Sequence, residues 1–358
     1  MDKITILLGV LTLLIACSEQ GGAASEGGSQ APLAGSTGGS KADEVSPDEL
    51  SCPEPVGLDC EQCPESEPEP EPEPSRRELN LNIDADNLYA WRKVRASLDT
   101  EQDVVFYWSG YVYHYAAKDP ADYAEGSYNV SFESPLFRFE GFNVARFADD
   151  GAGGYVMLSR EVSVYQDPRS GQILDCWRNE LLEAQPFVSV MHVANDPVNY
   201  GVGQVSHLEL GDRVSFFSDI LVSYRSPLAA EPSLSPFSAS DVYQSNELFN
   251  FYASREDLED ESLETVPAEI SWTRVGQYLP WMQMGDRPGQ LIYHVRGYKV
   301  LDGVDGLPEP LRRWTEDVAG ASYLSAPEMI PQSYEPNATT WRVFRAAYEA
   351  GEYTPECD

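Results

Sequence analysis

The pattern of hydrophobic positions divides this chain of 358 residues into three regions. A short apolar run covers residues 4–15, and the segment 18–77 contains few large apolar side chains. From residue 78 to about residue 353, apolar positions recur at short intervals over some 275 residues. That length is sufficient for one large domain with its own core, so we expect a single domain over 78–358.

Within this body, most apolar stretches have the period of two that is typical of strands. Residues 104–108 alternate in this way, and 111–115 continue in β-forming residues. Turn residues separate the further β-rich stretches, which are 136–140, 142–147, 155–165, 173–177, 187–193, 205–210, 214–224, 269–275 and 290–300. Strands at this spacing form an antiparallel sheet that must close or stack to hide its faces. We expect a mainly β fold, a curled antiparallel sheet or a β-barrel that is lipocalin-like in general architecture, with a two-layer β-sandwich as the alternative.

Four stretches have helical spacing instead and predict peripheral helices. The first begins at Asp84 or Asp86, either of which can cap it. A helical insert is predicted over 241–255, and two helices are predicted near the C-terminus, over 309–318 and 340–349.

The N-terminus reads as the signal of a bacterial lipoprotein. Lys3 precedes the apolar run, and Leu14-Ile15-Ala16-Cys17 ends it with a small residue before a cysteine. About a dozen apolar residues is too short to span a bilayer, which needs ~20. We expect removal of residues 1–16 and lipidation of Cys17, an ordinary secretory signal being the alternative. Ser18 is similar to the residue found in lipoproteins sent to the outer membrane, so we expect an envelope protein there that faces the periplasm or the cell surface.

The segment 17–77 is predicted to be a disordered tether. It is rich in glycine and serine first, and a Glu-Pro repeat follows over 65–74. A solvated stalk explains this composition better than a charged ligand-binding tail.

The charge excludes one class of partner. The chain has a formal net charge of −35, and 20 of its 24 basic and 44 of its 59 acidic residues lie in the body, which gives the body about −24. Such a field repels phosphates, so we expect no nucleic-acid partner and membrane contact only through the lipid anchor.

The other five cysteines suggest disulfides rather than metal. Cys60 and Cys63 have the C-x-x-C spacing, but no second Cys/His pair is near enough to complete a zinc site. A local disulfide that involves two of Cys52, Cys60 and Cys63 suits an exported protein, and Cys176 could pair with Cys357. The pairing stays open, and no metal or cofactor is predicted.

The body resembles a family of uncharacterised proteins, the domain of unknown function 1838. The matching blocks are 97–99, 108–110, 140–146, 160–162, 165–167, Gly171, 177–179, 192–198, 271–274, 293–294 and the longest, Leu279-Pro280-Trp281-Met282-Gln283-Met284-Gly285-Asp286-Arg287-Pro288-Gly289. The resemblance implies one continuous domain and no assigned activity.

The histidines are the candidates for catalysis. His192 precedes the Asn195-Asp196 turn, and His294 follows the long loop 281–289. One interpretation makes His192 or His294 a general base with Asp196 as its orienting acid. The other makes them hydrogen-bonded histidines of the sheet. No spacing supports a three-histidine metal site.

The arginines are the candidates for ligand binding. Arg146, Arg160, Arg274 and Arg296 fall within predicted strands, where a guanidinium is costly unless it is paired or solvated. Each could pair with a carboxylate such as Glu140, Glu161 or Asp286, or could hold an anionic group of a ligand. The predicted ligand-binding residues are Arg146, Arg160, Asn195, Arg274, Trp281 and Arg287. The loop that contains the last two has the composition of a mobile lid or of a plug.

Three functions remain open from the sequence. The leading hypothesis is a lipid-anchored periplasmic protein that binds a small, partly apolar or anionic molecule in a cavity of the β-rich domain. The alternatives are a hydrolase or isomerase that uses His192 or His294 with Asp196, and a structural envelope lipoprotein.

Overall fold

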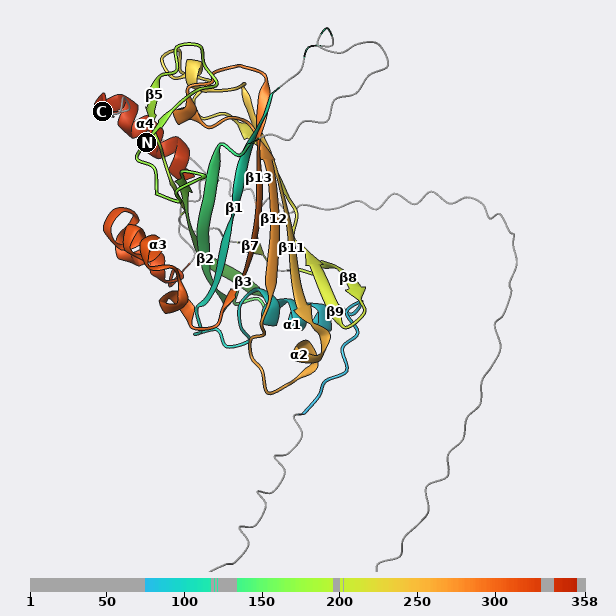
Figure 1. The fold of residues 1–358 in the computed structure, drawn as a ribbon. Coiled ribbons are helices and arrows are strands. Elements are labelled where there is room, and N and C mark those ends of the chain that lie inside the picture. The colour runs from blue at the N-terminus through green and yellow to red at the C-terminus, as the bar shows by residue number, and fades with distance from the viewer. Residues whose placement is uncertain are drawn as a thin grey trace, which may run out of the picture. The chain divides into compact units, whose positions relative to one another are not determined.

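The computed structural model describes residues 75–116, 119, 121, 134–195, 200–201, 203–329 and 338–352 (Figure 1). The chain separates into two units, Met1–Glu69 and Pro70–Asp358, and all described residues belong to the second. The predicted signal, Cys17, residues 18–74 of the predicted tether, Asp196 and Cys357 lie outside the described residues, whereas the last three residues of the predicted tether are described and Arg77 pairs with Asp86 at 2.6 Å. No helix among those described is both long and apolar enough to cross a bilayer.

A large antiparallel sheet forms the centre of the domain (Figure 1). Its eleven strands run in the order β6-β3-β2-β1-β13-β12-β11-β9-β8, with β7 paired to β3 and β10 paired to β11. The strands are β1 (Val104–Ala116), β2 (Phe137–Asp149), β3 (Tyr155–Gln166), β6 (Val193–Asn195), β7 (Tyr200–Gly201), β8 (Ser206–Leu210), β9 (Arg213–Phe217), β10 (Ile220–Arg225), β11 (Val242–Ser254), β12 (Glu269–Gly276) and β13 (Gly289–Val300). Two short strands, β4 (Cys176–Arg178) and β5 (Phe187–Ser189), form a separate ribbon. The mainly β prediction is confirmed.

The two predicted strands at 136–147 are one continuous strand, β2, which passes through Gly141. A Cβ at Gly141 would collide with the Val162 carbonyl and the Ser163 hydroxyl of the neighbouring strand. Glycine therefore permits the close approach of β2 and β3 that a side chain would prevent.

The sheet is curled, as expected, but it is not a barrel. Side chains of β3 and β11, which four strands separate in the sheet, line the same cavities. Among the described residues, no ladder joins β3, β6 or β7 to β8, β9 or β10, so the barrel prediction is wrong and the sheet remains open. Because the described residues form one large sheet, the β-sandwich alternative is also wrong.

One predicted helix is a strand. The segment 241–255 forms β11, whose residues alternate between exposed and buried from Val242 to Ser245. The cluster of apolar residues later in this segment resembles a helical face, but Phe249 and Phe251 both point to the concave side of the sheet at a spacing of two. Pairing with β12 on one side and with β9 and β10 on the other outweighs this local pattern.

The other three predicted helices are confirmed. Helix α1 (Asp84–Arg95) has acidic residues in its first turn and basic residues in its last, as the helix dipole favours. Helix α3 (Glu309–Trp314) continues into a π-helical turn over Thr315–Gly320, and α4 (Ala338–Ala350) follows. Helix α2 (Arg255–Glu259), which the sequence did not predict, is a single short turn after β11.

Each face of the sheet packs against helices. On the concave face, Trp91 of α1 makes edge-to-face contact with Phe251 at a ring distance of 5.2 Å. On the convex face, Leu311 of α3 belongs to a second apolar cluster over β1, β2 and β3, together with Val105, Phe142, Val144, Val162, Val164, Val300 and Leu307. Figure 1 shows α3 beside the sheet and α1 and α2 near one end of the long strands.

Two buried lysines attach the helices to the sheet. Lys299 of β13 donates from Nζ to the carbonyls of Lys93 and Ala96, at 2.7 and 3.1 Å, and to Thr265 Oγ1. Lys93 in turn donates from Nζ to three carbonyls at the end of α2, those of Asp257, Leu258 and Asp260, at 2.7–2.9 Å. Burial lowers the pKa of both lysines. The two side chains satisfy carbonyls at helix C-termini that would otherwise lack donors.

We expect Lys299→Met to destabilise the domain by about 2–4 kcal/mol, because it leaves buried carbonyls of α1 without a donor. Urea unfolding followed by circular dichroism measures the loss. Arg296→Met on the same strand is the matched control, since Arg296 is exposed on the opposite face. Equal effects of the two changes would show that Lys299 does not hold α1.

Candidate binding cavity

The concave side of the sheet encloses a cavity of about 550 Å³. Aromatic side chains dominate its wall, and they are Trp91, Phe106, Trp108, Phe147, Phe217, Phe249, Phe251 and Trp272. Helix α1 supplies the first of these, the last residue of β9 supplies Phe217, and inward-facing positions of β1, β2, β11 and β12 supply the others. The volume lies within the range of small-molecule pockets in proteins.

Residues on either side of the open seam line the same cavity. The segment 203–206 leads into β8, and the segment 217–220 connects β9 to β10. They include the exposed lining residues Gly203, Gln204, Ser206 and Asp219. The buried Asn87 of α1 exchanges two hydrogen bonds with the backbone of Val205, at 2.8 and 2.9 Å. The segment around Val205, which Asn87 of α1 holds by hydrogen bonds, therefore lies between the two edges of the sheet. In a closed barrel, those edges would be joined by a ladder of backbone hydrogen bonds.

Three polar side chains lie deeper in the wall, Arg95, Asn143 and Glu161. Arg95 donates to Asn143 Oδ1, and its guanidinium lies 5.6 and 5.7 Å from the ring centroids of Phe106 and Phe251. Trp108 and Trp272 also carry buried indole N–H groups that have no acceptor among the described residues. A ligand with an oxygen acceptor would satisfy such donors.

A smaller cavity of about 60 Å³ continues from the first and shares Glu161 and Trp272 with it. Successive inward residues of β12 pass from one to the other, since Ile270 lines the first, Trp272 both and Arg274 the second. The larger cavity is aromatic, whereas the smaller one is rich in ionisable groups.

Arg274 is the centre of the smaller cavity. It donates to Tyr243 Oη, lies 3.4 Å from a Glu247 oxygen, and stacks over the Tyr293 ring at 4.9 Å. Tyr293 and Tyr165 share a hydrogen bond of 2.9 Å. Burial raises the pKa of Glu247, and Arg274 partly offsets this effect.

Glu161 of β3 lies opposite this cluster. Burial, and then the negative charge of Glu247, raise the pKa of Glu161 to about 7, against the opposing effects of Asn195, Arg274 and Arg95. Its carboxylate accepts a long hydrogen bond of 3.4 Å from Asn195 Nδ2. Protonation of Glu161 is therefore balanced near neutral pH.

Two of the predicted ligand-binding residues lie in the smaller cavity, Arg274 and Asn195. Trp281 is buried in the core against Phe137 and Tyr165, and it lines neither cavity. Arg287 is exposed and donates to the Met284 carbonyl at 3.1 Å. The buried part of the loop 281–289 agrees with a plug rather than a lid.

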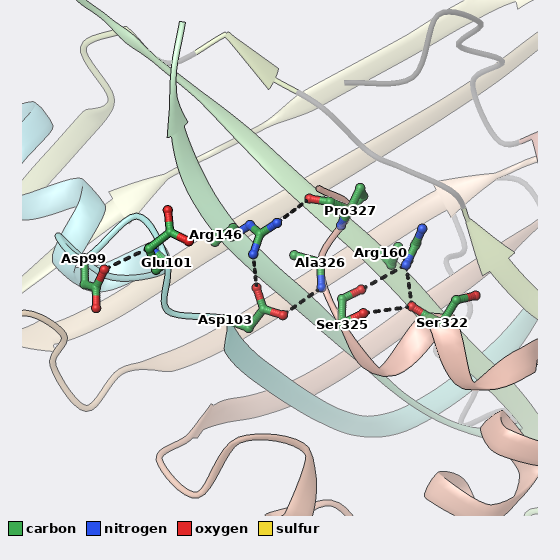
Figure 2. Close-up of polar contacts among 9 residues, drawn as sticks. All are labelled: Asp99, Glu101, Asp103, Arg146, Arg160, Ser322, Ser325, Ala326 and Pro327. Atoms are coloured by element: carbon green, nitrogen blue, oxygen red, sulfur yellow. Dashed lines mark hydrogen bonds and ion pairs between the residues drawn. The ribbon is translucent and has the colours of Figure 1, made fainter. Parts of the chain in front are cut away.

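Arg146 and Arg160 line neither cavity and share the convex face with Val144 and Val162. Figure 2 shows both side chains directed toward the segment 322–327. Arg146 lies between Asp103, at 3.7 Å, and the Pro327 carbonyl, at 3.0 Å. Arg160 donates to the carbonyls of Ser322 and Ser325. Both guanidinium groups hold the segment that follows α3 on the sheet, so the structure gives them a packing role at these positions.

The predicted catalytic histidines do not meet. His192 lies beside β3, where its Nδ1 accepts from the Tyr165 N–H at 3.1 Å and its ring contacts Trp314 at 4.8 Å. Burial lowers the pKa of His192 to about 4. His294 is exposed on β13, three strand intervals from β3 in the sheet. Neither lines a cavity, and the third member of the predicted set, Asp196, lies outside the described residues.

No group of three or more potential metal ligands occurs within the part of the chain that the structure describes. Cys176 is disulfide-bonded, and its pairing with Cys357 stays a prediction.

A family model matches residues 101–348, more than two thirds of the chain. The chain belongs to the DUF1838 family of proteins of unknown function. No curated protein matches it. The DUF1838 match covers every strand and nearly all of α4, whereas α1, which supplies Trp91 and Arg95, precedes it.

Sequence reasoning missed most of the cavity. The sequence predicts Trp108 only as a strand residue and Glu161 only as a partner for an arginine. It predicts no role for Arg95. One signal was present, because Glu161 occupies an inward position of β3 between Ser159 and Ser163. Which face of the sheet the side chains of β3 occupy depends on its register with the neighbouring strands, and the sequence of β3 alone does not determine that register.

We expect Glu161→Gln to raise the free energy of unfolding at pH 8 by on the order of 2 kcal/mol. A folded pKa of about 7 exceeds the unfolded value, so the glutamate stabilises the native state at low pH and loses that contribution as pH rises through 7. The gain from the substitution should therefore shrink toward pH 5. Urea unfolding at both pH values tests this, with the exposed Glu180→Gln as the control. The same gain at both pH values would contradict it.

Proposed function

We propose that this DUF1838 protein is a lipid-anchored envelope protein that binds a small, partly apolar molecule in the aromatic cavity. The cavity of about 550 Å³ with eight aromatic residues in its wall is the observation that carries the proposal. A purely structural protein gains no stability from an unfilled apolar space, since an empty cavity costs packing energy.

Polar groups in the wall support a ligand that is not a plain hydrocarbon. The indole N–H groups of Trp108 and Trp272 add hydrogen-bond donors to an otherwise apolar wall. The proposed ligand therefore has an apolar body and at least one oxygen acceptor.

The envelope location rests on the sequence alone. The lipobox Leu14-Ile15-Ala16-Cys17 supports an acyl anchor, and the acidic segment that follows supports a solvated stalk. Several acyl chains would attach the protein stably where one would be marginal.

Ligand binding is tested with N-phenyl-1-naphthylamine, a neutral dye that fluoresces in apolar sites. We expect saturable binding to the full chain carrying Cys17→Ser, in which no acyl chain competes for the dye. Gln204→Trp, at the exposed edge of the cavity, should weaken binding by about tenfold, because the indole obstructs a space of this size. Gln244→Trp, exposed outside both cavities, is the control. Equal binding by the two variants would refute the cavity as the site.

Anchoring is tested by fractionation of a Gram-negative host that expresses the full chain. We expect the wild-type protein in the membrane fraction and Cys17→Ser, with residues 1–16 replaced by an ordinary cleavable secretory signal, in the soluble fraction, because the thioether-linked lipid is lost. Cys52→Ser, which removes a cysteine of the tether, should stay with the membrane. Membrane association of Cys17→Ser would contradict the anchor.

A further inference from the structure

Glu161 is the carboxylate through which the two cavities meet. Its one hydrogen bond is the long contact with Asn195, and no lysine or arginine among the described residues forms an ion pair with it. A carboxylate in such a place normally has a cation or several donors beside it.

The positive groups nearby are already engaged. Arg274 is shared by Glu247 and Tyr243, and Arg95 is held by Asn143 between two phenyl rings. Both guanidinium groups attract the Glu161 carboxylate through space, but neither forms an ion pair with it among the described residues. Asp219 adds a second negative charge among the exposed lining residues.

The walls next to Glu161 suit a cation. Trp272 lines both cavities with Glu161, and the Phe249 ring stacks on it at 5.5 Å with an interplanar angle of 2°. Trp108 meets Trp272 edge to face at 5.9 Å. Electron-rich ring faces attract cations, most strongly on tryptophan. Arg95 already uses two rings of the same chamber in this way.

The long-range field favours the same ligand charge. The chain carries a net charge of −35, so it attracts cations from solution and repels anions. The four arginines that the sequence offered as anion-binding groups are either paired or outside the cavity, as Arg274, Arg146, Arg160 and Arg287 show.

We propose that the cavity selects an organic ammonium ligand, with its cationic nitrogen beside Glu161 and its apolar body against Trp108, Phe249 and Trp272. This inference rests on the proposed binding function and names the class of ligand. It differs from the anionic ligand that the sequence suggested, because the carboxylate at the junction of the two cavities, Glu161, has no ion-pair partner among the described residues.

Such binding depends on pH in a defined direction. The charged groups that face Glu161 are Arg95 from α1, Glu247 from β11 and Arg274 from β12, with Asn195 from β6 as its hydrogen-bond donor. Because the pKa of Glu161 is about 7, its ionised fraction rises between pH 6 and pH 8. Affinity for a permanent cation should rise with it, by about tenfold over that interval.

Three probes that share a naphthalene ring test the ligand charge. They are (1-naphthylmethyl)trimethylammonium, 1-naphthylmethanol and 1-naphthylacetate, and each is titrated into the full chain carrying Cys17→Ser by displacement of the neutral dye. At pH 8 we expect the cation to bind about tenfold more tightly than the alcohol and the anion most weakly. The preference for the cation should disappear at pH 6.

Glu161→Gln is the decisive variant. It should lose about tenfold in affinity for the cation at pH 8 and all of its pH dependence, and it should keep its affinity for the alcohol. Glu180→Gln, exposed outside both cavities, should behave as wild type. If Glu161→Gln fails to fold, the pH dependence of the wild-type protein decides the question by itself.

The outcomes separate the two proposals. If neither the dye nor any probe binds, the proposed function fails. If the dye and the alcohol bind but the cation has no preference at pH 8, or if the anion binds most tightly, the cavity stands and the assignment of an ammonium ligand is overturned.

Discussion

The contact of Lys299 with the end of α1 is the interaction on which the binding chamber depends. Two of its hydrogen bonds, to the carbonyls of Lys93 and Ala96, place the last turn of α1 against β13, and that turn carries Arg95. Trp91 lies one turn earlier on the same helix and reaches the aromatic rings of β11. Without this attachment the concave face would lose one wall, and the apolar rings of β1, β11 and β12 would face water.

The interior of the curled sheet combines two environments that rarely adjoin. One part is a dry aromatic space, and the next contains Arg274, Glu247 and three tyrosines in hydrogen-bonded contact. Burying these groups costs free energy that a purely apolar filling would avoid. A similar shape could be achieved with leucine and phenylalanine, and the position of the polar set next to the larger cavity suits the ligand-binding function proposed above.

The sequence predicted the positions of the strands along the chain better than their pairing in the sheet. Period-two patterns located nearly every strand of the sheet, because alternation survives wherever one face is buried. The helix predicted over 241–255 is wrong because the spacing of Leu248, Phe249, Phe251 and Tyr252 also fits a helical face. The pairing with β9 and β12 that makes this segment a strand is not visible in the local sequence. Arg146 and Arg160 were correctly recognised as unusual strand residues, but which face each occupies depends on register, and register is a long-range property. Glu161 could not be identified for the same reason, since its surroundings come from α1, β6, β11 and β12.

If the cavity binds a ligand as proposed, the open seam offers that ligand a route of entry. A closed barrel would have to break a ladder to admit a molecule from the side, whereas here Asn87 holds the intervening segment at Val205 by hydrogen bonds that are each worth only ~1 kcal/mol. Thermal motion can break the hydrogen bonds between Asn87 and Val205 without breaking any strand pairing. Access is then a matter of local breathing at one asparagine, and the rigid sheet can keep its aromatic wall in place during exchange with the surroundings.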